Sequence, residues 1–189
     1  ASRNGEPFFE LIDQNGSPYL PNPVKRICTA KLKIRVIHKY VKSLGWQHGE
    51  DEDWVGIRAD EQRRAAKIDR SRTPLVTAGI TKEIVGAFWK SQPFDLELPN
   101  MNGVTMHGNC DLCFLKPAHQ ILSLIREKPE KALWWMKMEK HAQSSNKTYG
   151  DGARFRKDRP SYEEMYNFAN NQSEMFDQAE EAIPCFCGD

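Results

Sequence analysis

The chain has 189 residues, of which 39% are hydrophobic and 28% charged, and 27 Lys and Arg against 26 Asp and Glu leave a net charge of +1. This length supports about one domain with a sizeable core, and the near-neutral charge excludes a nucleic-acid binder that acts through a polybasic tail. No apolar run approaches the roughly 20 residues that span a bilayer, and no signal peptide opens the chain. We therefore expect a cytoplasmic protein.

The first half of the chain predicts helices separated by short strands. Residues 1–23 are rich in Pro and Gly and predict a loop with one turn of helix near 8–12. Apolar residues recur at three- and four-residue steps over residues 26–44, which is typical of an amphipathic helix, and Gly45 ends it. The apolar runs at 54–58 and 74–76 predict buried strands.

Two further helices are predicted in this half. Asp60 can cap a helix that runs to about Ile68, and Thr81 can cap a second short helix. The apolar residues expected to point inward from the second helix are Ile84, Val85, Phe88 and Trp89.

The second half predicts helices only. Residues 91–109 are rich in Pro, Asn and Gly and should be irregular, whereas residues 112–126 and 129–141 should be helical. Ser161 followed by Glu164 forms a capping box that opens a third helix near residues 162–172. Trp134 and Trp135, within the second of these helices, are expected to be core residues.

The five cysteines include two close pairs, which fits a disulfide framework poorly and a metal or redox site better. Cys110-Asp-Leu-Cys113 is the strongest motif, because a C-x-x-C turn lets two thiolates converge on one ion. The other ligands must come from Cys28, from Cys185 or Cys187, or from a histidine. The histidine candidates are His107 and His119. The alternative is a pair of inert buried thiols and a frayed tail.

A second motif, Gly56-Ile-Arg58-Ala-Asp60-Glu61, places an arginine between a predicted strand and a helix N-terminus. A guanidinium and free N–H groups at one turn suit a phosphate or sulfate. The alternative is a strand-to-helix turn with a solvated arginine and two carboxylates that stabilise the helix dipole.

Basic residues also gather at two other places. Four of them surround Cys28 at the start of the first long helix, where cations and a helix N-terminus would lower the pKa of its thiol. The four are Lys25, Arg26, Lys31 and Lys33. A second run lies in a loop, where it is either solvated surface or, with Phe155 and Tyr149 interleaved, a contact to the backbone of DNA or RNA. This run comprises Arg154, Arg156, Lys157 and Arg159.

Taken together, five segments resemble the phosphoadenosine phosphosulfate (PAPS) reductase family, in its branch encoded by phages and bacteria. In chain order they read R-I-C-T-A-K-L-K, G-I-R-A-D-E-Q-R-R, G-N-C-D-L-C-F-L-K, R-K-D-R-P-S-Y and C-F-C-G-D. The family belongs to the adenine nucleotide alpha-hydrolase, or PP-loop, superfamily. The resemblance implies an α/β fold with two or three short strands. Residues 1–103 would belong to the PP-loop-like domain, and residues 104–189 would form a helical, cysteine-stapled region packed against it.

The resemblance also implies a ligand set and an anion site. Adenylylsulfate reductases hold a 4Fe–4S cluster between a Cys-Cys pair and a C-x-x-C some eighty residues later, and roughly eighty residues separate Cys28 from Cys110. Thr29 replaces the second cysteine of the pair, so Cys185 or Cys187 is expected to supply the fourth ligand. The residues that match the family's anion-binding positions are Arg26, Lys33, Gly56, Arg58 and Arg64.

One family feature is missing. The S-G-G-x-D-S loop that cradles the nucleotide phosphates does not occur in this sequence, so we expect that it lies in a missing N-terminal segment or that this branch has lost it.

Two functions follow. The first is nucleotide-dependent sulfur or sulfonyl transfer, with Arg58 holding an anionic group of an adenine nucleotide or sulfonucleotide and Cys187 acting as a catalytic thiolate. It would carry a 4Fe–4S cluster or, alternatively, zinc. The second is a non-catalytic zinc-stapled module that binds nucleic acid or a protein through residues 154–159.

Overall fold

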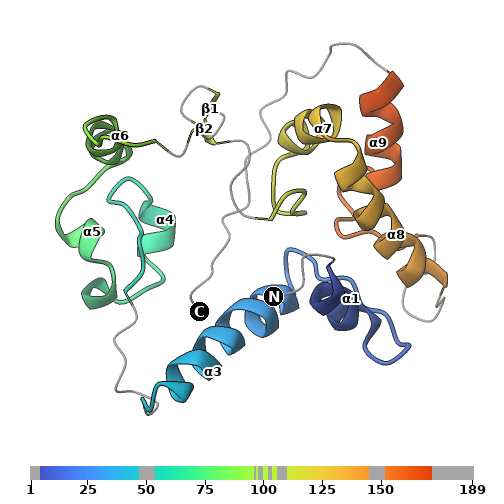
Figure 1. The fold of residues 1–189 in the computed structure, drawn as a ribbon, viewed down its shortest axis with the longest axis horizontal. Helices are drawn as coiled ribbons and strands as arrows, with labels where there is room; N and C mark the ends of the chain where they lie inside the picture. The colour runs from blue at the N-terminus through green and yellow to red at the C-terminus, as the bar shows by residue number, and fades with distance from the viewer. Residues whose placement is uncertain are drawn as a thin grey trace. The chain divides into compact units, whose positions relative to one another are not determined.

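The computed structural model describes residues 5–46, 54–95, 97, 100–101, 104–105, 110–144 and 152–171. Two compact units can be distinguished along the chain, and Figure 1 gives their elements. The described part of the first unit comprises residues 5–35 and 100–171, and that of the second comprises residues within 36–97. The first unit stops at Arg35 and resumes at Pro99, whereas the sequence predicted a single domain boundary at residue 103.

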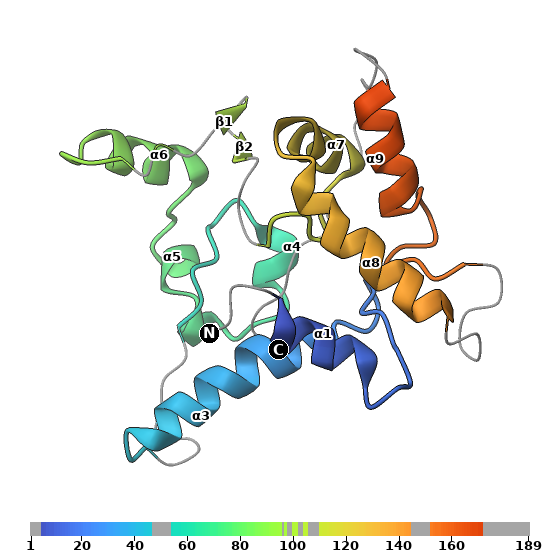
Figure 2. The same ribbon diagram turned by 45° about the vertical axis from the view of Figure 1, so that its right-hand side comes forward.

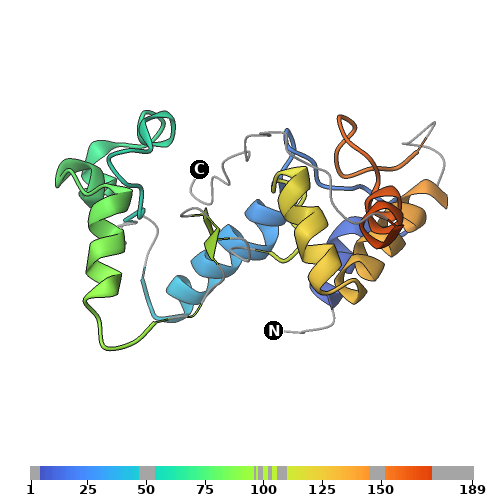
Figure 3. The ribbon, with the colours of Figure 1, turned by 90° about the horizontal axis from the view of Figure 1, so that it is seen from above.

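The first unit is a helical cluster. Helices α7 (Ala118–Glu127) and α8 (Glu130–Ser144) both pack against α9 (Tyr162–Asn171), and α1 (Glu6–Asp13) packs against α8. Figure 2 shows this grouping, and the yellow, orange and red ribbons of the same three C-terminal helices lie together in Figure 3. The expected capping box opens α9: the Ser161 N–H donates to the Glu164 carboxylate at 2.6 Å, and the Glu164 N–H donates to Ser161 Oγ at 3.2 Å.

Aromatic rings fill the core of this unit. Trp135 stacks on Tyr162 with ring centroids 5.1 Å apart and meets Phe155 edge-on at 4.9 Å, while Phe114 stacks on Phe155 at 5.6 Å. Trp135 is buried, which confirms the expected core position, and Trp134 packs against the core partly buried. Such ring pairs contribute about 0.5–1.5 kcal/mol each beyond their buried area, so the cluster fixes how the helices meet.

The helix expected over residues 26–44 is present in three consecutive parts. These are α2 (Ile27–Thr29), the π-helical turn η1 (Ala30–Ile34) and α3 (Arg35–Ser43). Gly45 follows with a φ of 92°, a left-handed conformation that glycine adopts without strain. Helix α3 is amphipathic, as the sequence predicted. It nevertheless contains no buried residue, and Val36, Ile37 and Tyr40 are each more than half exposed.

The second unit does not contain the two expected strands. Residues 54–58 form no strand: the Ile57 N–H donates to the Val55 carbonyl within the segment, the Val55 N–H donates to the Arg72 carbonyl and the Ala59 N–H to the Ile80 carbonyl, all at 2.8 Å. Residues 74–76 belong to a short helix, α5 (Pro74–Thr77). Proline at its first position suits a helix start, because the missing N–H would have no partner there.

The remaining elements of this unit are short. Helix α4 (Gln62–Ala65) is shorter than expected and begins after Glu61 rather than Asp60, and the 3-10 turn η2 (Arg70–Arg72) follows it before α5. Thr81 lies at the expected N-cap position of α6 (Lys82–Lys90), but its side chain makes no capping hydrogen bond. The inward orientation expected for the apolar face of α6 is wrong, since Ile84, Phe88 and Trp89 are about half exposed.

The α/β fold class is therefore wrong for the described residues, whose regular secondary structure is almost entirely helical. Their β structure is limited to one antiparallel pairing of two-residue segments, β1 (Asn100–Met101) and β2 (Val104–Thr105). The apolar runs read as strands are only three to five residues long, and for such short runs periodicity cannot separate a strand from a helical turn. No helix among the described residues has both the length and the apolarity to cross a membrane.

Candidate functional site

The Cys110–Cys113 motif forms a tight turn, as expected for a metal-binding or redox-active pair. The Cys113 N–H donates to the Cys110 carbonyl at 3.2 Å, and the Lys116 N–H then donates to the Cys113 carbonyl at 2.9 Å. Cys110 is exposed, Cys113 is half-buried against the core, and neither forms a disulfide. One thiol is thus accessible from solvent while the other is held against the helices.

Cys28 belongs to the same unit and packs, partly buried, against the same core. Burial raises the pKa of the Cys28 thiol, and the charge of Cys110 raises it further against the opposing hydrogen bond to the Thr29 N–H. The expectation that nearby cations lower this pKa is therefore wrong. Cys28 and Cys113 thus pack against the same core, although roughly eighty residues separate them in sequence.

The C-x-x-C turn is held by two side chains of the R-K-D-R-P-S-Y segment. Buried Arg159 donates to the carbonyl oxygens of Lys116 at 2.7 Å and Phe114 at 3.0 Å. The hydroxyl of buried Tyr162 donates to the carbonyl oxygen of Leu112 at 2.5 Å. Two of the segments on which the family resemblance depends are therefore in direct contact.

A buried carboxylate, Glu139 of α8, holds that segment in place. Its two oxygens accept the Phe155 N–H at 3.1 Å and the Tyr162 N–H at 2.8 Å. Burial raises the pKa of Glu139 to about 7, although both N–H donors and the charges of Arg154 and Arg159 act in the opposite direction. Sequence reasoning missed this residue; the available signal was a lone glutamate among Trp135, Met136 and Met138.

A charged pair and a lysine complete the surroundings of the turn. Lys131 of α8 forms an ion pair with Asp111 at 3.0 Å, which ties the turn to that helix. Lys116 is buried, and burial lowers the pKa of its ammonium, while the charges of Cys113, Asp111 and Cys110 raise it. The thiol pair therefore lies beside a buried cation.

These thiols do not by themselves complete a metal site. Over the part of the chain that the structure describes, no three His, Cys, Asp or Glu side chains are grouped as metal ligands. His119, at the start of α7, is exposed. The other candidate ligands, His107, Cys185 and Cys187, lie outside the described residues, so the expected fourth ligand remains a prediction.

The predicted anion site is divided between the units, with Arg26 and Lys33 in the first and Gly56, Arg58 and Arg64 in the second. The Arg58 guanidinium is bound by carboxylates: it contacts Asp60 at 2.9 and 3.0 Å and Glu61 at 3.7 Å. Glu61 also pairs with Arg64 at 2.5 Å. Asp60 accepts the Lys82 N–H at 3.1 Å, which joins the turn to the first residue of α6.

The contacts of Arg58 with two carboxylates allow two variants to test whether Arg58 binds an anion. We expect Arg58→Ala to weaken sulfate binding by about 5- to 10-fold, because a charge-assisted hydrogen bond is lost. We expect Asp60→Asn to strengthen it, because a bound sulfate must compete with the Asp60 carboxylate for the guanidinium. Isothermal titration with sulfate measures both changes, and Lys90→Ala, an exposed cation of the same unit, is the control. Unchanged affinity in Arg58→Ala would rule out the site.

The run at residues 154–159 is not the exposed basic patch that nucleic-acid binding requires. Arg156 and Arg159 are buried; Arg156 pairs with Asp158 and holds the pKa of that carboxyl at about 2. Arg154 pairs with Glu164 at 3.2 Å, and only Lys157 of the four cations is exposed. Three of the four cations therefore form contacts within the protein, and the run stabilises the fold.

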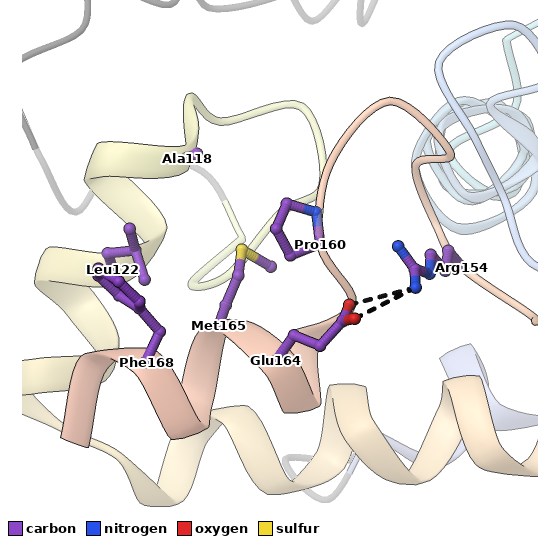
Figure 4. Close-up of a pocket in the computed structure, with 7 residues that line it drawn as sticks. All are labelled: Ala118, Leu122, Arg154, Pro160, Glu164, Met165 and Phe168. Atoms are coloured by element: carbon purple, nitrogen blue, oxygen red, sulfur yellow. Dashed lines mark hydrogen bonds and ion pairs between the residues drawn. The ribbon is translucent and has the colours of Figure 1, made fainter. Parts of the chain in front are cut away.

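A cavity of about 370 Å³ lies between α7 and α9 in the first unit, as shown in Figure 4. Apolar side chains form most of its wall, and the Arg154–Glu164 ion pair lies at one side. The full lining consists of Ala118, Leu122, Arg154, Pro160, Glu164, Met165 and Phe168. Its size suits a small apolar group.

The chain is similar to one uncharacterized phage protein, the nin region protein ORF290 of Escherichia phage lambda, with 33% identity over 116 residues. The aligned part covers 61% of this chain and 37% of the relative, so the chain spans less than two fifths of that protein. No protein-family model matches the chain, and no solved structure does. The relative is a phage protein that carries no named activity.

Proposed function

We propose that the chain takes part in nucleotide-dependent sulfur or sulfonyl transfer of the PAPS reductase type and carries a thiolate-bound metal centre. The carrying observation is the hydrogen-bonded C-x-x-C turn: two of the motif segments that suggest this family touch each other through Arg159 and Tyr162, and Cys28 packs against the same core as Cys113. A turn whose backbone is fixed between and after its two thiols is suited to holding metal ligands.

In this proposal Cys110 and Cys113 supply two ligands, Cys28, which the described structure does not group with them, would join them when the metal binds, and Cys185 or Cys187 supplies the fourth. Four thiolates suit a 4Fe–4S cluster or a zinc ion. When bound, the metal would join segments that are far apart in sequence and stabilise the deprotonated thiols. Buried Lys116 would offset part of the negative charge that four thiolates bring to this site.

The tail cysteine that is not a ligand, Cys187 in our assignment, would act as the nucleophile. Its thiolate sulfur would attack the sulfonyl sulfur of a sulfonucleotide, forming an S–S bond while the S–O bond to the nucleotide phosphate breaks. The leaving group is the nucleotide, which keeps the oxygen of the broken bond on its phosphate as a negative charge. A dithiol reductant then supplies two electrons, which releases sulfite and restores the thiol. Arg58 would hold an anionic group of the nucleotide.

The experiment is metal analysis combined with an activity assay. Protein purified without oxygen is analysed for iron, acid-labile sulfide and zinc, and is then incubated with a sulfonucleotide and a dithiol while sulfite is measured. We expect a brown protein with iron and sulfide, or a colourless one with one zinc per chain, together with sulfite release. Zinc without sulfite release would favour the non-catalytic binding module instead. Absence of any bound metal would overturn the proposal.

A further inference from the structure

We propose that Arg159 and Tyr162 are positioning residues, which hold the Cys110–Cys113 turn in the shape that binds a thiophilic metal ion. This inference rests on the proposed metal centre and assigns two residues a role in it that the sequence motif alone does not indicate. Both side chains come from the segment between α8 and α9 or from the start of α9, and both reach the turn more than forty residues away in sequence.

The placement of the three hydrogen bonds supports the assignment. Leu112 lies between the two cysteines, and its carbonyl oxygen accepts the Tyr162 hydroxyl at 2.5 Å. Phe114 and Lys116 follow Cys113, and both of their carbonyl oxygens accept from the planar Arg159 guanidinium, at 3.0 and 2.7 Å. Tyr162 therefore holds the peptide group before Cys113, and the Lys116 N–H holds the one after it by donating to the Cys113 carbonyl at 2.9 Å. Arg159 holds the backbone that follows, so the direction of the Cys113 Cα–Cβ bond is fixed.

The two bracing side chains are themselves fixed. The Tyr162 N–H donates to Glu139 at 2.8 Å, and the Tyr162 ring stacks on Trp135. The Arg159 carbonyl accepts Arg154 Nη1 at 3.3 Å. A bracing group that could move freely would not preorganise a ligand, whereas these two residues are buried and hydrogen-bonded. Groups that orient metal ligands in this way typically change metal affinity 10- to 100-fold when they are replaced.

The first test removes a single hydrogen bond. In Tyr162→Phe the ring stays in the core but the hydroxyl that donates to Leu112 is absent. Co²⁺ is titrated into reduced, metal-free protein, and the sulfur-to-cobalt absorption band reports thiolate binding. We expect affinity to fall about 10-fold relative to the unaltered protein. Tyr166→Phe, on the same helix, is the matched control and should bind Co²⁺ unchanged.

The second test asks whether geometry or charge matters at Arg159. Lysine keeps the charge but cannot donate to two carbonyl oxygens in the fixed fork of a guanidinium. We expect Arg159→Lys to weaken Co²⁺ binding by 10- to 100-fold, while a change at exposed Lys157 of the same loop, Lys157→Met, has no effect. Thermal unfolding of the metal-free variants shows whether each remains folded at the titration temperature.

Alkylation of the metal-free protein gives a readout that needs no metal. If the brace positions Cys113, its alkylation rate should rise toward that of exposed Cys110 in Tyr162→Phe, while the rate of Cys28 stays constant. If the unaltered protein binds Co²⁺ through thiolates but neither variant changes affinity or alkylation, the positioning role is wrong and the metal centre stands. If the unaltered protein binds no Co²⁺, the proposed metal centre fails, and with it the positioning of metal ligands.

Discussion

Replacement of Glu139 by alanine is expected to lower the free energy of unfolding by about 3–5 kcal/mol. The substitution leaves the buried N–H groups of Phe155 and Tyr162 without an acceptor and removes the carboxylate that faces Arg154 and Arg159. Urea unfolding at pH 7 measures the change. Glu163→Gln, a surface glutamate that pairs with Lys140, is the control and should change stability by less than about 1 kcal/mol.

The same residue predicts a pH dependence of stability. The pKa of Glu139 is about 7 in the folded protein, above the ordinary value of 4.5, so the folded state keeps its proton over a range in which the unfolded state has lost it. This contribution is therefore fully present below about pH 4.5 and is lost as the pH rises through 7, by about 3 kcal/mol in all. Glu139→Gln should remove that part of the slope. An identical pH profile in the variant would contradict the assignment.

Cysteine replacement is expected to have the largest effect on metal binding. Cys110→Ser and Cys113→Ser should each weaken binding by at least about 100-fold, because a hydroxyl is a poor substitute for one of four thiolates. Metal content after dialysis against a chelator, measured on protein made without oxygen, reports the loss. The metal-free variants should unfold at the same urea concentration as the metal-free parent, which separates lost ligation from lost folding.

Serine replacement can also distinguish the roles of the two tail cysteines, Cys185 and Cys187. One of Cys185→Ser and Cys187→Ser should lose metal, and the other should keep metal but lose sulfite release. Full metal content in both single variants and in the double variant would show that the tail supplies no ligand.

Much of the local structure was predictable, because it depends on neighbours in the sequence. The capping box at Ser161 and Glu164 is visible in four residues, and the C-x-x-C turn follows from the spacing of Cys110 and Cys113. The core position of Trp135 follows equally from its size and its place within a predicted helix.

The bracing contacts were not predictable in this way. Arg156 and Arg159 look like solvated cations because nothing in a basic loop shows which guanidinium will find buried carbonyl oxygens. The short apolar run at residues 54–58 suggested a strand, but a strand needs a partner, and here the N–H of Val55 meets a 3-10 turn instead. Glu139 likewise shows its role only once two N–H groups from a distant loop reach it.

By itself the sequence determined the approximate positions of the helices near residues 26–44, 129–141 and 162–172, that the cysteines occur in close pairs, and which segments resemble a known family, since each depends on spacing along the chain. Only the tertiary structure decided that two of those segments touch, that the basic loop is a brace, and that the pKa of Cys28 is raised. Each of these depends on burial and on contacts between residues far apart in sequence, where a desolvated group is stabilised only by the partner that the fold brings to it.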